Sequence, residues 1–237
     1  MPPRLTIVVP VHNEAGFLPE ALPRLIGVAS GLGDDVEVLV AENGSTDSTA
    51  EIARSFADAH GRITILNLPE PDYGAAMRAG FLAASGEWVA NVDIDYFSEE
   101  FLRAALDLGD EADVVLASKR AVGAEDRRSL LRRLGTFGFN LLLRALFRSK
   151  VSDTHGMKVL RRSVVTEIAP EVISTRDLFD TELVIRAERA GYRIVEVPAL
   201  VEEMREARSS FLKRVPRTLA GLLRIRRALR GERRSAR

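Results

Sequence analysis

The sequence of 237 residues contains no cysteine, so no disulfide framework can stabilise its fold. This absence fits a reducing compartment. The sequence also lacks any apolar run of about 18 to 20 residues, the length that a membrane-spanning helix needs. Its first residues, "MPPRLTIVVPVHNE", carry one arginine and a short apolar run, a pattern unlike that of a signal peptide. We therefore expect a cytoplasmic protein that does not cross a bilayer by itself.

Aromatic residues make up only 6% of the chain, and the formal net charge is zero. Surfaces that stack nucleic-acid bases interleave aromatic with basic side chains, and no such pattern occurs, so we expect no nucleic-acid partner. The charge is nevertheless uneven, because residues 205–237 hold 12 Lys or Arg against two acidic residues. The length suffices for one sizeable α/β domain, which we place at residues 1–210, followed by a basic amphipathic helix and tail at 211–237.

The first half of the chain alternates β-rich runs with helical stretches. We expect strands at 5–10, 36–41, 63–66, 88–92 and 113–117, and helices at 16–30, 46–59, 74–84 and 98–108. This alternation predicts an α/β fold with a mostly parallel central sheet flanked by helices. Ligands of such sheets bind outside the carboxyl ends of the strands. The loops at 11–14, 42–47, 69–74 and 93–97 are therefore the expected place of function.

After residue 118 the alternation is looser. We expect an apolar, basic helical region at 129–147, a loop running into a short strand at 150–162 and a helix at 180–190. A strand at 192–197, an extended or loop segment at 201–208, an amphipathic helix at 218–230 and a disordered end complete the chain. The two basic amphipathic regions can lie in a membrane interface, or they can pack on the protein's own core or on another subunit.

Asp93 and Asp95 directly follow the apolar run "WVANV", with Ile94 between them. In extended chain such a pair would point to opposite faces, but once the strand turns both carboxylates can converge on one cation. Mg²⁺ and Mn²⁺ prefer oxygen ligands and commonly take one or two carboxylates together with phosphate oxygens. The alternative is a solvated loop or a cap for the helix at 98–108. The buried strand and its position in the sheet favour the metal site.

Two further loops leave predicted strands. In "VVPVHNEAGFL", Asn13 and Glu14 precede a helix, where they can cap it or bind a nucleobase or ribose. In "AENGSTDST", Asn43 and Gly44 suit a turn, and the Ser, Thr and Asp that follow suit capping. Capping does not explain Glu42, which could accept from the N–H groups of uracil or guanine.

Four stretches, taken in order, resemble family 2 glycosyltransferases of the GT-A fold: "TIVVPVHNE", "AENGSTDST", "YGAAMRAGFLAASGEWVANVDID" and "FDTELVIRAERAGYRIVEVP". Within that family the chain is most similar to the branch that transfers mannose or glucose to dolichyl or polyprenyl phosphate, over about residues 5–213. The resemblance implies an inverting, metal-dependent enzyme that moves a hexose from a GDP-mannose or UDP-glucose type donor to a polyprenyl phosphate. The alternatives are a glycosyltransferase with a soluble hydroxyl acceptor and a non-catalytic nucleotide-sugar-binding module.

The resemblance also implies the site residues. The metal, Mg²⁺ or Mn²⁺, would be bound by Asp93, Asp95 and His155. The nucleotide sugar would contact Pro10, Val11, Asn13, Glu14, Glu42, Asn43, Gly74, Arg78, Asp93, Ile94 and Asp95. The acceptor and its phosphate would contact Arg132, Arg133, Asp153, His155, Lys158, Arg205, Arg208, Ser209 and Lys213. The catalytic residues would be Asp93, Asp95, Asp180 and Arg205, with Asp180 as general base if the acceptor is a hydroxyl.

The sequence departs from the family pattern at several positions. Glu42 and Asn43 stand where the family usually has two aspartates, Phe97 where the polyprenyl branch often has Gln, and Phe137 where it often has Arg. The stretch "VSDTHGMK" resembles the family's Asp-Thr-x-x-Gly-Phe-Lys segment but is one residue shorter. We further expect peripheral contact with the cytoplasmic face of a membrane. A homo-oligomer or a membrane-anchoring partner protein is left open.

Overall fold

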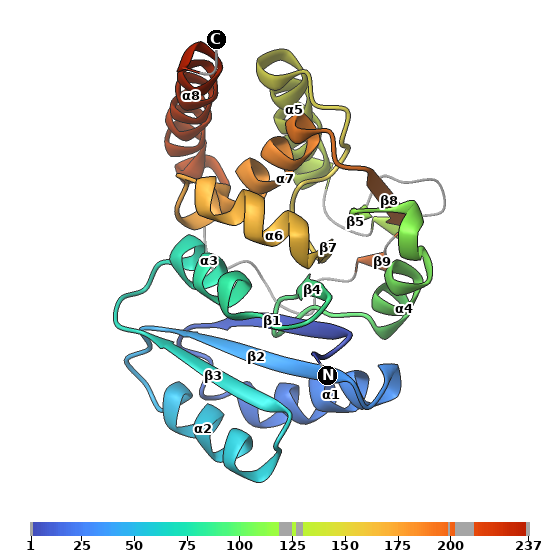
Figure 1. Cartoon of the computed structure of the whole chain (residues 1–237). Helices are drawn as coiled ribbons and strands as arrows, with labels where there is room; N and C mark the ends of the chain where they lie inside the picture. Colours follow the sequence, from blue (N-terminus) through green and yellow to red (C-terminus); the bar gives the residue numbers. More distant parts are fainter. Residues whose placement is uncertain (1, 119–124, 127–129, 199, 202–210, 236–237) are drawn as a thin grey trace.

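The computed structural model describes residues 2–118, 125–126, 130–198, 200–201 and 211–235. Its main sheet has seven strands in the order β3-β2-β1-β4-β7-β5-β8 (Figure 1). The strands are β1 (Leu5–Val11), β2 (Val36–Asn43), β3 (Ile63–Leu68), β4 (Trp88–Asn91), β5 (Val114–Ser118), β7 (Lys158–Arg161) and β8 (Ile194–Pro198). Only β7 runs antiparallel to its two neighbours, and the other pairs within this sheet are parallel. The predicted mostly parallel sheet is confirmed.

Helices cover both faces of this sheet. On one face lie α1 (Leu18–Leu32), α2 (Thr49–Ala59) and α4 (Glu99–Asp107), and on the other lie α3 (Tyr73–Ala83), α6 (Arg162–Ile168) and α7 (Phe179–Ala190). Alternating residues of each strand serve the two layers, so Ile7 and Val9 enter the first core and Val8 enters the second. All three side chains are fully buried. Two apolar cores therefore cover the sheet, one on each face, and fix its register.

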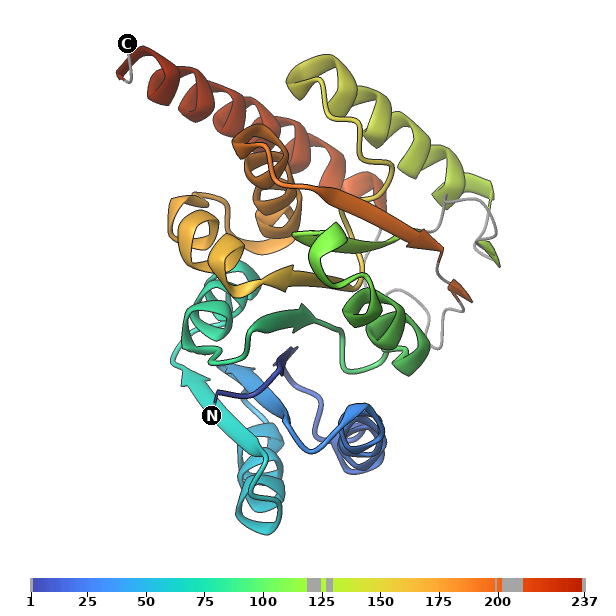
Figure 2. The ribbon, with the colours of Figure 1, turned by 45° about the vertical axis from the view of Figure 1, so that its right-hand side comes forward.

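Two long helices form a third apolar cluster at the end of the molecule opposite α2 (Figures 1 and 2). These are α5 (Leu130–Phe147) and α8 (Phe211–Ser235). Their buried residues meet those of α7 and of the segment before it: Leu143, Phe147, Leu178, Ile185, Leu222, Ile225 and Leu229. One face of α8 therefore packs on the protein's own core. Within the described residues, no helix is both long enough and apolar enough to span a membrane.

Several predicted boundaries were wrong. Helix α8 starts at Phe211 and continues to Ser235, so the predicted helix at 218–230 was too short and the expected disorder is wrong for residues 231–235. The helix α6 was missed because it is only seven residues long and its start has no side-chain cap. The strands β6 (Glu125–Asp126) and β9 (Leu200–Val201) form a separate parallel pair. Beyond residue 201, the expected extended segment at 201–208 lies outside the described residues.

Short 3-10 helices complete the described chain. They are η1 (Gly109–Glu111), η2 (Ala169–Glu171) and η3 (Arg176–Leu178). The last of these directly precedes α7 and contacts both α3 and α8. It thus joins the sheet layer to the long C-terminal helix.

Candidate active site

Three neighbouring strands end at one edge of the sheet. Parallel pairing aligns Val11 of β1 with Glu42 of β2, and Val8 of β1 with Asn91 of β4. The loops that follow these strands therefore leave the sheet side by side. Open α/β sheets bind ligands at such an edge, where strand order reverses on either side of β1. This edge holds most of the residues that the sequence predicts for the nucleotide sugar.

Hydrogen bonds lock the first two of these loops together. Asn13 has a left-handed backbone (φ 53°), and its Oδ1 accepts from the Thr46 backbone N–H at 2.8 Å. Its own N–H donates to Ser45 Oγ at 3.0 Å, and the Glu14 N–H donates to Thr49 Oγ1 at 2.7 Å. Left-handed backbone is tolerated best by Gly, Asn and Asp, so asparagine suits this position. These hydrogen bonds join the two loops into one unit.

Glu42 and Asn43 have structural partners in this unit. Glu42 is only 4% exposed, and its Oε1 accepts from the Ser45 N–H at 2.7 Å, which closes the turn. Asn43 Oδ1 accepts from the Asp72 N–H at 2.8 Å and so ties the loop after β3 to the others. His12 Nδ1 donates to the Asn43 carbonyl at 2.8 Å, a contact that sequence reasoning missed. The turn explains Glu42, and its contact with a nucleobase stays a prediction.

Asp93 and Asp95 follow β4 in a tight turn. The buried Ile94 anchors the turn in the core, and the Tyr96 N–H donates to the Asp93 carbonyl at 3.0 Å. Asp93 is exposed and Asp95 is half-buried. The cap of α4 is Ser98, whose Oγ accepts from the Phe101 N–H at 3.1 Å. Because Ser98 caps the helix, helix capping does not account for the two aspartates.

The residues around this turn fit a hard divalent cation. Within the described part of the chain, no group of three or more His, Cys, Asp or Glu is placed to hold a metal. The structure therefore does not bring His155 together with both aspartates; its ring packs edge-on against Phe139, with 5.4 Å between centroids. Two carboxylates remain, and they suit Mg²⁺ or Mn²⁺ when phosphate oxygens and water complete the coordination.

A buried carboxylate lies near the same turn. Asp153 is 4% exposed, and its Oδ2 has no hydrogen-bond partner among the described residues. Burial, followed by the charges of Asp153 and Asp93, raises the pKa of Tyr96 to about 12. Tyr96 is therefore a neutral phenol near both carboxylates at neutral pH. A buried carboxylate oxygen without a partner is costly, so a cation or a donor group of a ligand would relieve it.

Asp180 is held by two donors from different elements. It is 6% exposed; its Oδ1 accepts from Lys158 Nζ at 2.9 Å, and its Oδ2 accepts from the Tyr73 hydroxyl at 2.7 Å. Burial and the charges of Asp180 and Asp93 raise the pKa of Tyr73 well above its ordinary value, so the phenol stays protonated and donates. Asn91 Nδ2 in turn donates to the Tyr73 oxygen at 3.4 Å. Sequence reasoning found Asp180 but missed Tyr73.

Lys158 is the other half of this pair. It is 1% exposed, and its ammonium also donates to the Gly156 carbonyl at 2.8 Å. A lysine this deeply buried needs a carboxylate partner to offset the hydration that its ammonium loses. In this structure the Lys158 ammonium binds Asp180. Its contact with an acceptor phosphate stays a prediction.

Gly74 and Arg78, predicted to contact the nucleotide sugar, hold α3 against the segment before α7. A Cβ at Gly74 would lie 2.7 Å from Thr175 Cα, so only glycine permits this approach. Arg78 donates to the Val172 carbonyl, and its Nε is buried without a partner among the described residues. Both have a structural role here, and their contact with a donor stays a prediction.

The remaining predicted residues are placed as follows. Pro10 is half-buried and Val11 buried at the end of β1. Arg205, Arg208 and Ser209 lie outside the described residues, and the described residues give no side-chain placement for Arg132, Arg133 and Lys213. The structure therefore describes the predicted nucleotide-sugar residues at the strand ends. Many of the residues predicted to bind the acceptor phosphate lie outside the described part of the chain.

Comparison with known proteins identifies both the family and the fold. The sequence profile of glycosyl transferase family 2 matches residues 6–169. An uncharacterized glycosyltransferase of Mycobacterium tuberculosis (strain ATCC 25618 / H37Rv) is 32% identical over 195 residues, which cover 81% of this chain and 83% of the relative. A dolichyl-phosphate beta-glucosyltransferase of Trichomonas vaginalis is 30% identical over 219 residues, which cover 86% of this chain and 65% of that protein.

Among solved structures, the chain is similar to glucosyl-3-phosphoglycerate synthase from Mycobacterium tuberculosis. That enzyme was crystallised in complex with Mn²⁺, uridine diphosphate and glucosyl-3-phosphoglycerate. The two folds agree with a TM-score of 0.71 at 22% identity, covering 94% of this chain and 80% of the synthase. The predicted GT-A fold is thereby confirmed.

Proposed function

Because this chain belongs to glycosyl transferase family 2 and is a glycosyltransferase, we propose that it transfers a hexose to the phosphate of a polyprenyl lipid. The donor is a nucleotide-diphosphate sugar of the GDP-mannose or UDP-glucose type, and the anomeric carbon is inverted. The observation that carries the acceptor class is the environment of Asp180, because each of its oxygens already accepts a hydrogen bond, one from Lys158 and one from Tyr73. The similarity to a dolichyl-phosphate beta-glucosyltransferase supports the same acceptor.

The chemistry of the acceptor explains why Asp180 matters. A phosphate monoester is already anionic at neutral pH, since its second pKa is about 6. Its oxygen can form a bond to the anomeric carbon as the bond from that carbon to the diphosphate breaks, and no proton has to be removed. A hydroxyl acceptor must lose a proton, so it needs a general base within hydrogen-bond reach. A carboxylate that already accepts from an ammonium and a phenol is poorly suited to that task.

The donor belongs at the strand-end edge. The loops after β1 and β2, locked through Asn13, would hold the nucleoside, and Asp93 and Asp95 would hold a divalent cation on the diphosphate. When bound, the cation would stabilise the negative charge of the leaving diphosphate. The Mn²⁺ and uridine diphosphate named for the mycobacterial synthase support this assignment. Arg205 and Lys213 stay the predicted cations for the phosphates.

A soluble acceptor is the second candidate. The fold similarity to glucosyl-3-phosphoglycerate synthase favours it, because the product named for that enzyme is water-soluble. Under this alternative Asp180 would be the general base. It would then have to accept the proton while its oxygens still accept hydrogen bonds from Tyr73 and Lys158, which lower its basicity.

A lipid acceptor requires contact with a membrane, and we propose that α5 and α8 supply it on the cytoplasmic face. Phe137 and Leu141 of α5 are 55% and 58% exposed. On α8, Val215, Leu219 and Leu223 are also exposed, at helical spacing and among arginines. Exposed apolar residues with basic neighbours are typical of helices that lie in a membrane interface. Each basic residue near anionic lipid adds about 1 kcal/mol of binding free energy.

The proposal is tested by a mass-spectrometric transfer assay. The purified protein receives Mg²⁺ or Mn²⁺, a panel of GDP- and UDP-sugars and a short polyprenyl phosphate, with Asp95→Ala as the control. A glycosyl-phospholipid formed from one donor, and absent with the variant, is the expected result. Release of free nucleotide without a lipid product would favour the soluble acceptor.

A further inference from the structure

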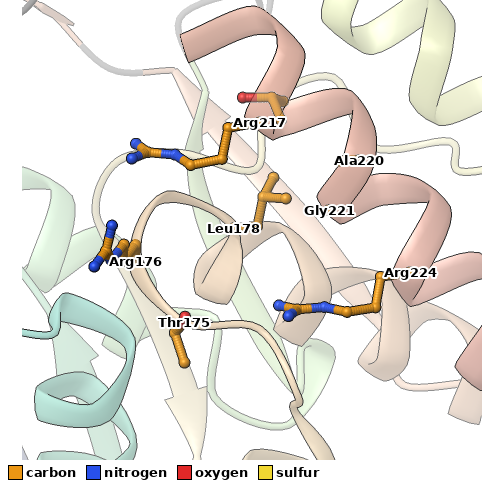
Figure 3. Close-up of a pocket in the computed structure, with 8 residues that line it drawn as sticks. Thr175, Arg176, Leu178, Arg217, Ala220, Gly221 and Arg224 are labelled. Atoms are coloured by element: carbon orange, nitrogen blue, oxygen red, sulfur yellow. The ribbon is translucent and has the colours of Figure 1, made fainter.

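A basic groove is formed where α8 packs against η3, outside the strand-end edge (Figure 3). It encloses ≈ 340 Å³ and is lined by Thr175, Arg176, Leu178, Arg217, Thr218, Ala220, Gly221 and Arg224. None of these residues belongs to the loops after β1, β2 and β4. The volume lies at the lower end of the range of small-molecule sites, roughly 300 to 1,000 Å³.

The wall formed by α8 approaches η3 unusually closely. A Cβ at Gly221 would collide with Leu178 Cδ1, so any larger residue would require the Leu178 side chain to shift. Glycine weakens a helix interior, so its presence here is explained by the close approach. The position of α8 is fixed further along by Arg186 of α7, whose Nη2 lies 3.0 Å from Glu232 Oε1. The groove therefore results from the packing of α8 on η3, which the ion pair between α7 and α8 helps to fix.

The opposite wall holds Arg176 in a rare backbone conformation. Its φ is 54°, in the left-handed region that non-glycine residues seldom adopt. Its N–H donates to Asp72 Oδ1 at 3.3 Å, and the preceding Thr175 packs against Gly74. Such strain persists only where the surroundings impose it, and it is concentrated at functional sites.

The lining is cationic and rich in donors. It contains three arginines and two threonines, and of the described residues that line it none is acidic. Arg217 and Arg224 extend from α8 toward the segment that carries Arg176 (Figure 3). The planar guanidinium fork matches the geometry of phosphate oxygens and binds them bidentately. We propose that this groove binds a phosphate group, separately from the nucleotide-sugar site. The phosphate is carried either by a soluble compound or by a phospholipid headgroup.

Phosphate binding is measured by calorimetric titration with inorganic phosphate, in EDTA so that no divalent cation draws phosphate to Asp93 and Asp95. The test variant combines Arg176→Asn, which tolerates left-handed backbone, with Arg224→Gln. The matched control combines Arg24→Gln in α1 with Arg54→Gln in α2, two exposed arginines that lie outside α8 and do not line the groove. We expect the wild type and the control to bind alike, and the test variant to bind about 100-fold more weakly, since each arginine contributes about 10-fold.

A second arm distinguishes the two sources of phosphate. The same three proteins are sedimented with phosphatidylcholine vesicles with and without phosphatidic acid. Inorganic phosphate binding that the test variant loses supports a soluble ligand. Binding only to phosphatidic acid vesicles, lost in the test variant but kept in the control, supports a headgroup. No binding in either arm, or equal behaviour of test variant and control, overturns the proposal. Both readouts are binding, so either result leaves the proposed transfer reaction untouched.

Discussion

The strand-end edge and the α5–α7–α8 end of the molecule are stabilised in different ways. At the edge, hydrogen bonds between the loops of neighbouring strands hold residues such as Asn13 and Thr46 in place. At the other end, an apolar cluster and an ion pair between Arg186 and Glu232 join helices far apart in the chain. The proposed donor side is therefore held by polar contacts between loops, whereas the proposed acceptor side is held by apolar packing and ion pairs between helices. Variants at the two ends should accordingly fail in different ways.

The largest effect is expected at the edge, from loss of the metal ligands. Asp95→Ala, or chelation of divalent cations with EDTA, is predicted to lower transfer by about 100-fold or more, because charge on the leaving diphosphate loses its stabilisation. The measurement is initial rate of product formation, with Asp107→Ala, an exposed aspartate of α4, as the matched control. Full activity in EDTA would contradict a metal at Asp93 and Asp95.

On the acceptor side, Asp180→Asn is predicted to cost mainly stability. It leaves the Lys158 ammonium buried without its carboxylate, at a cost of roughly 3 kcal/mol in the free energy of unfolding. Adding Lys158→Met removes the stranded charge and should recover most of that loss. Urea denaturation of the wild type, the single variant and the double variant measures both changes. A double variant no more stable than the single one would show that the ion pair is not the cause.

A smaller effect is expected from the loop contact at Asn13. Asn13→Ala removes the acceptor for the Thr46 N–H and places alanine at φ 53°, so we expect a loss of about 1–2 kcal/mol and a higher KM for the donor. Asn13→Gly keeps the backbone conformation and should lose less. Denaturation and donor titration distinguish the two variants. Equal stability of both would mean that the left-handed backbone carries no cost.

The smallest effect tests a site remote from both regions. Asp113 and Arg193 lie just before β5 and β8, at the opposite end of those strands from their carboxyl ends. A hydrogen bond from Arg193 is the largest cause that lowers the pKa of Asp113 from 3.8 to about 2. A depressed pKa stabilises the fold above the ordinary value, and this contribution is lost as pH falls from about 4 through 2. Asp113→Asn should therefore have a lower urea midpoint than the wild type at neutral pH. This difference should shrink as the pH falls from about 4 through 2. A difference independent of pH would contradict the assignment, and transfer should be unchanged.

Much of the donor side could be predicted from sequence. The apolar run before Asp93 marked β4, the alternation of elements gave the parallel sheet, and the rule for strand ends brought the loops together. The partners of Asp180 could not be found this way, because Tyr73 is 107 positions away and no periodic pattern links them. The close approach of Gly221 to Leu178 could not be predicted either, because it depends on how α8 packs on η3.

The central claim is that the acceptor is a phosphate and needs no general base. Its most direct test is a transfer assay with two acceptors of the same chain length, a polyprenyl phosphate and the corresponding polyprenol. The enzymes compared are the wild type and the Asp180→Asn, Lys158→Met double variant. We predict product from the polyprenyl phosphate only, with the double variant within about 10-fold of the wild type, since positioning rather than proton removal sets the rate. Transfer to the polyprenol that the double variant loses by several orders of magnitude would contradict the claim and make Asp180 the general base.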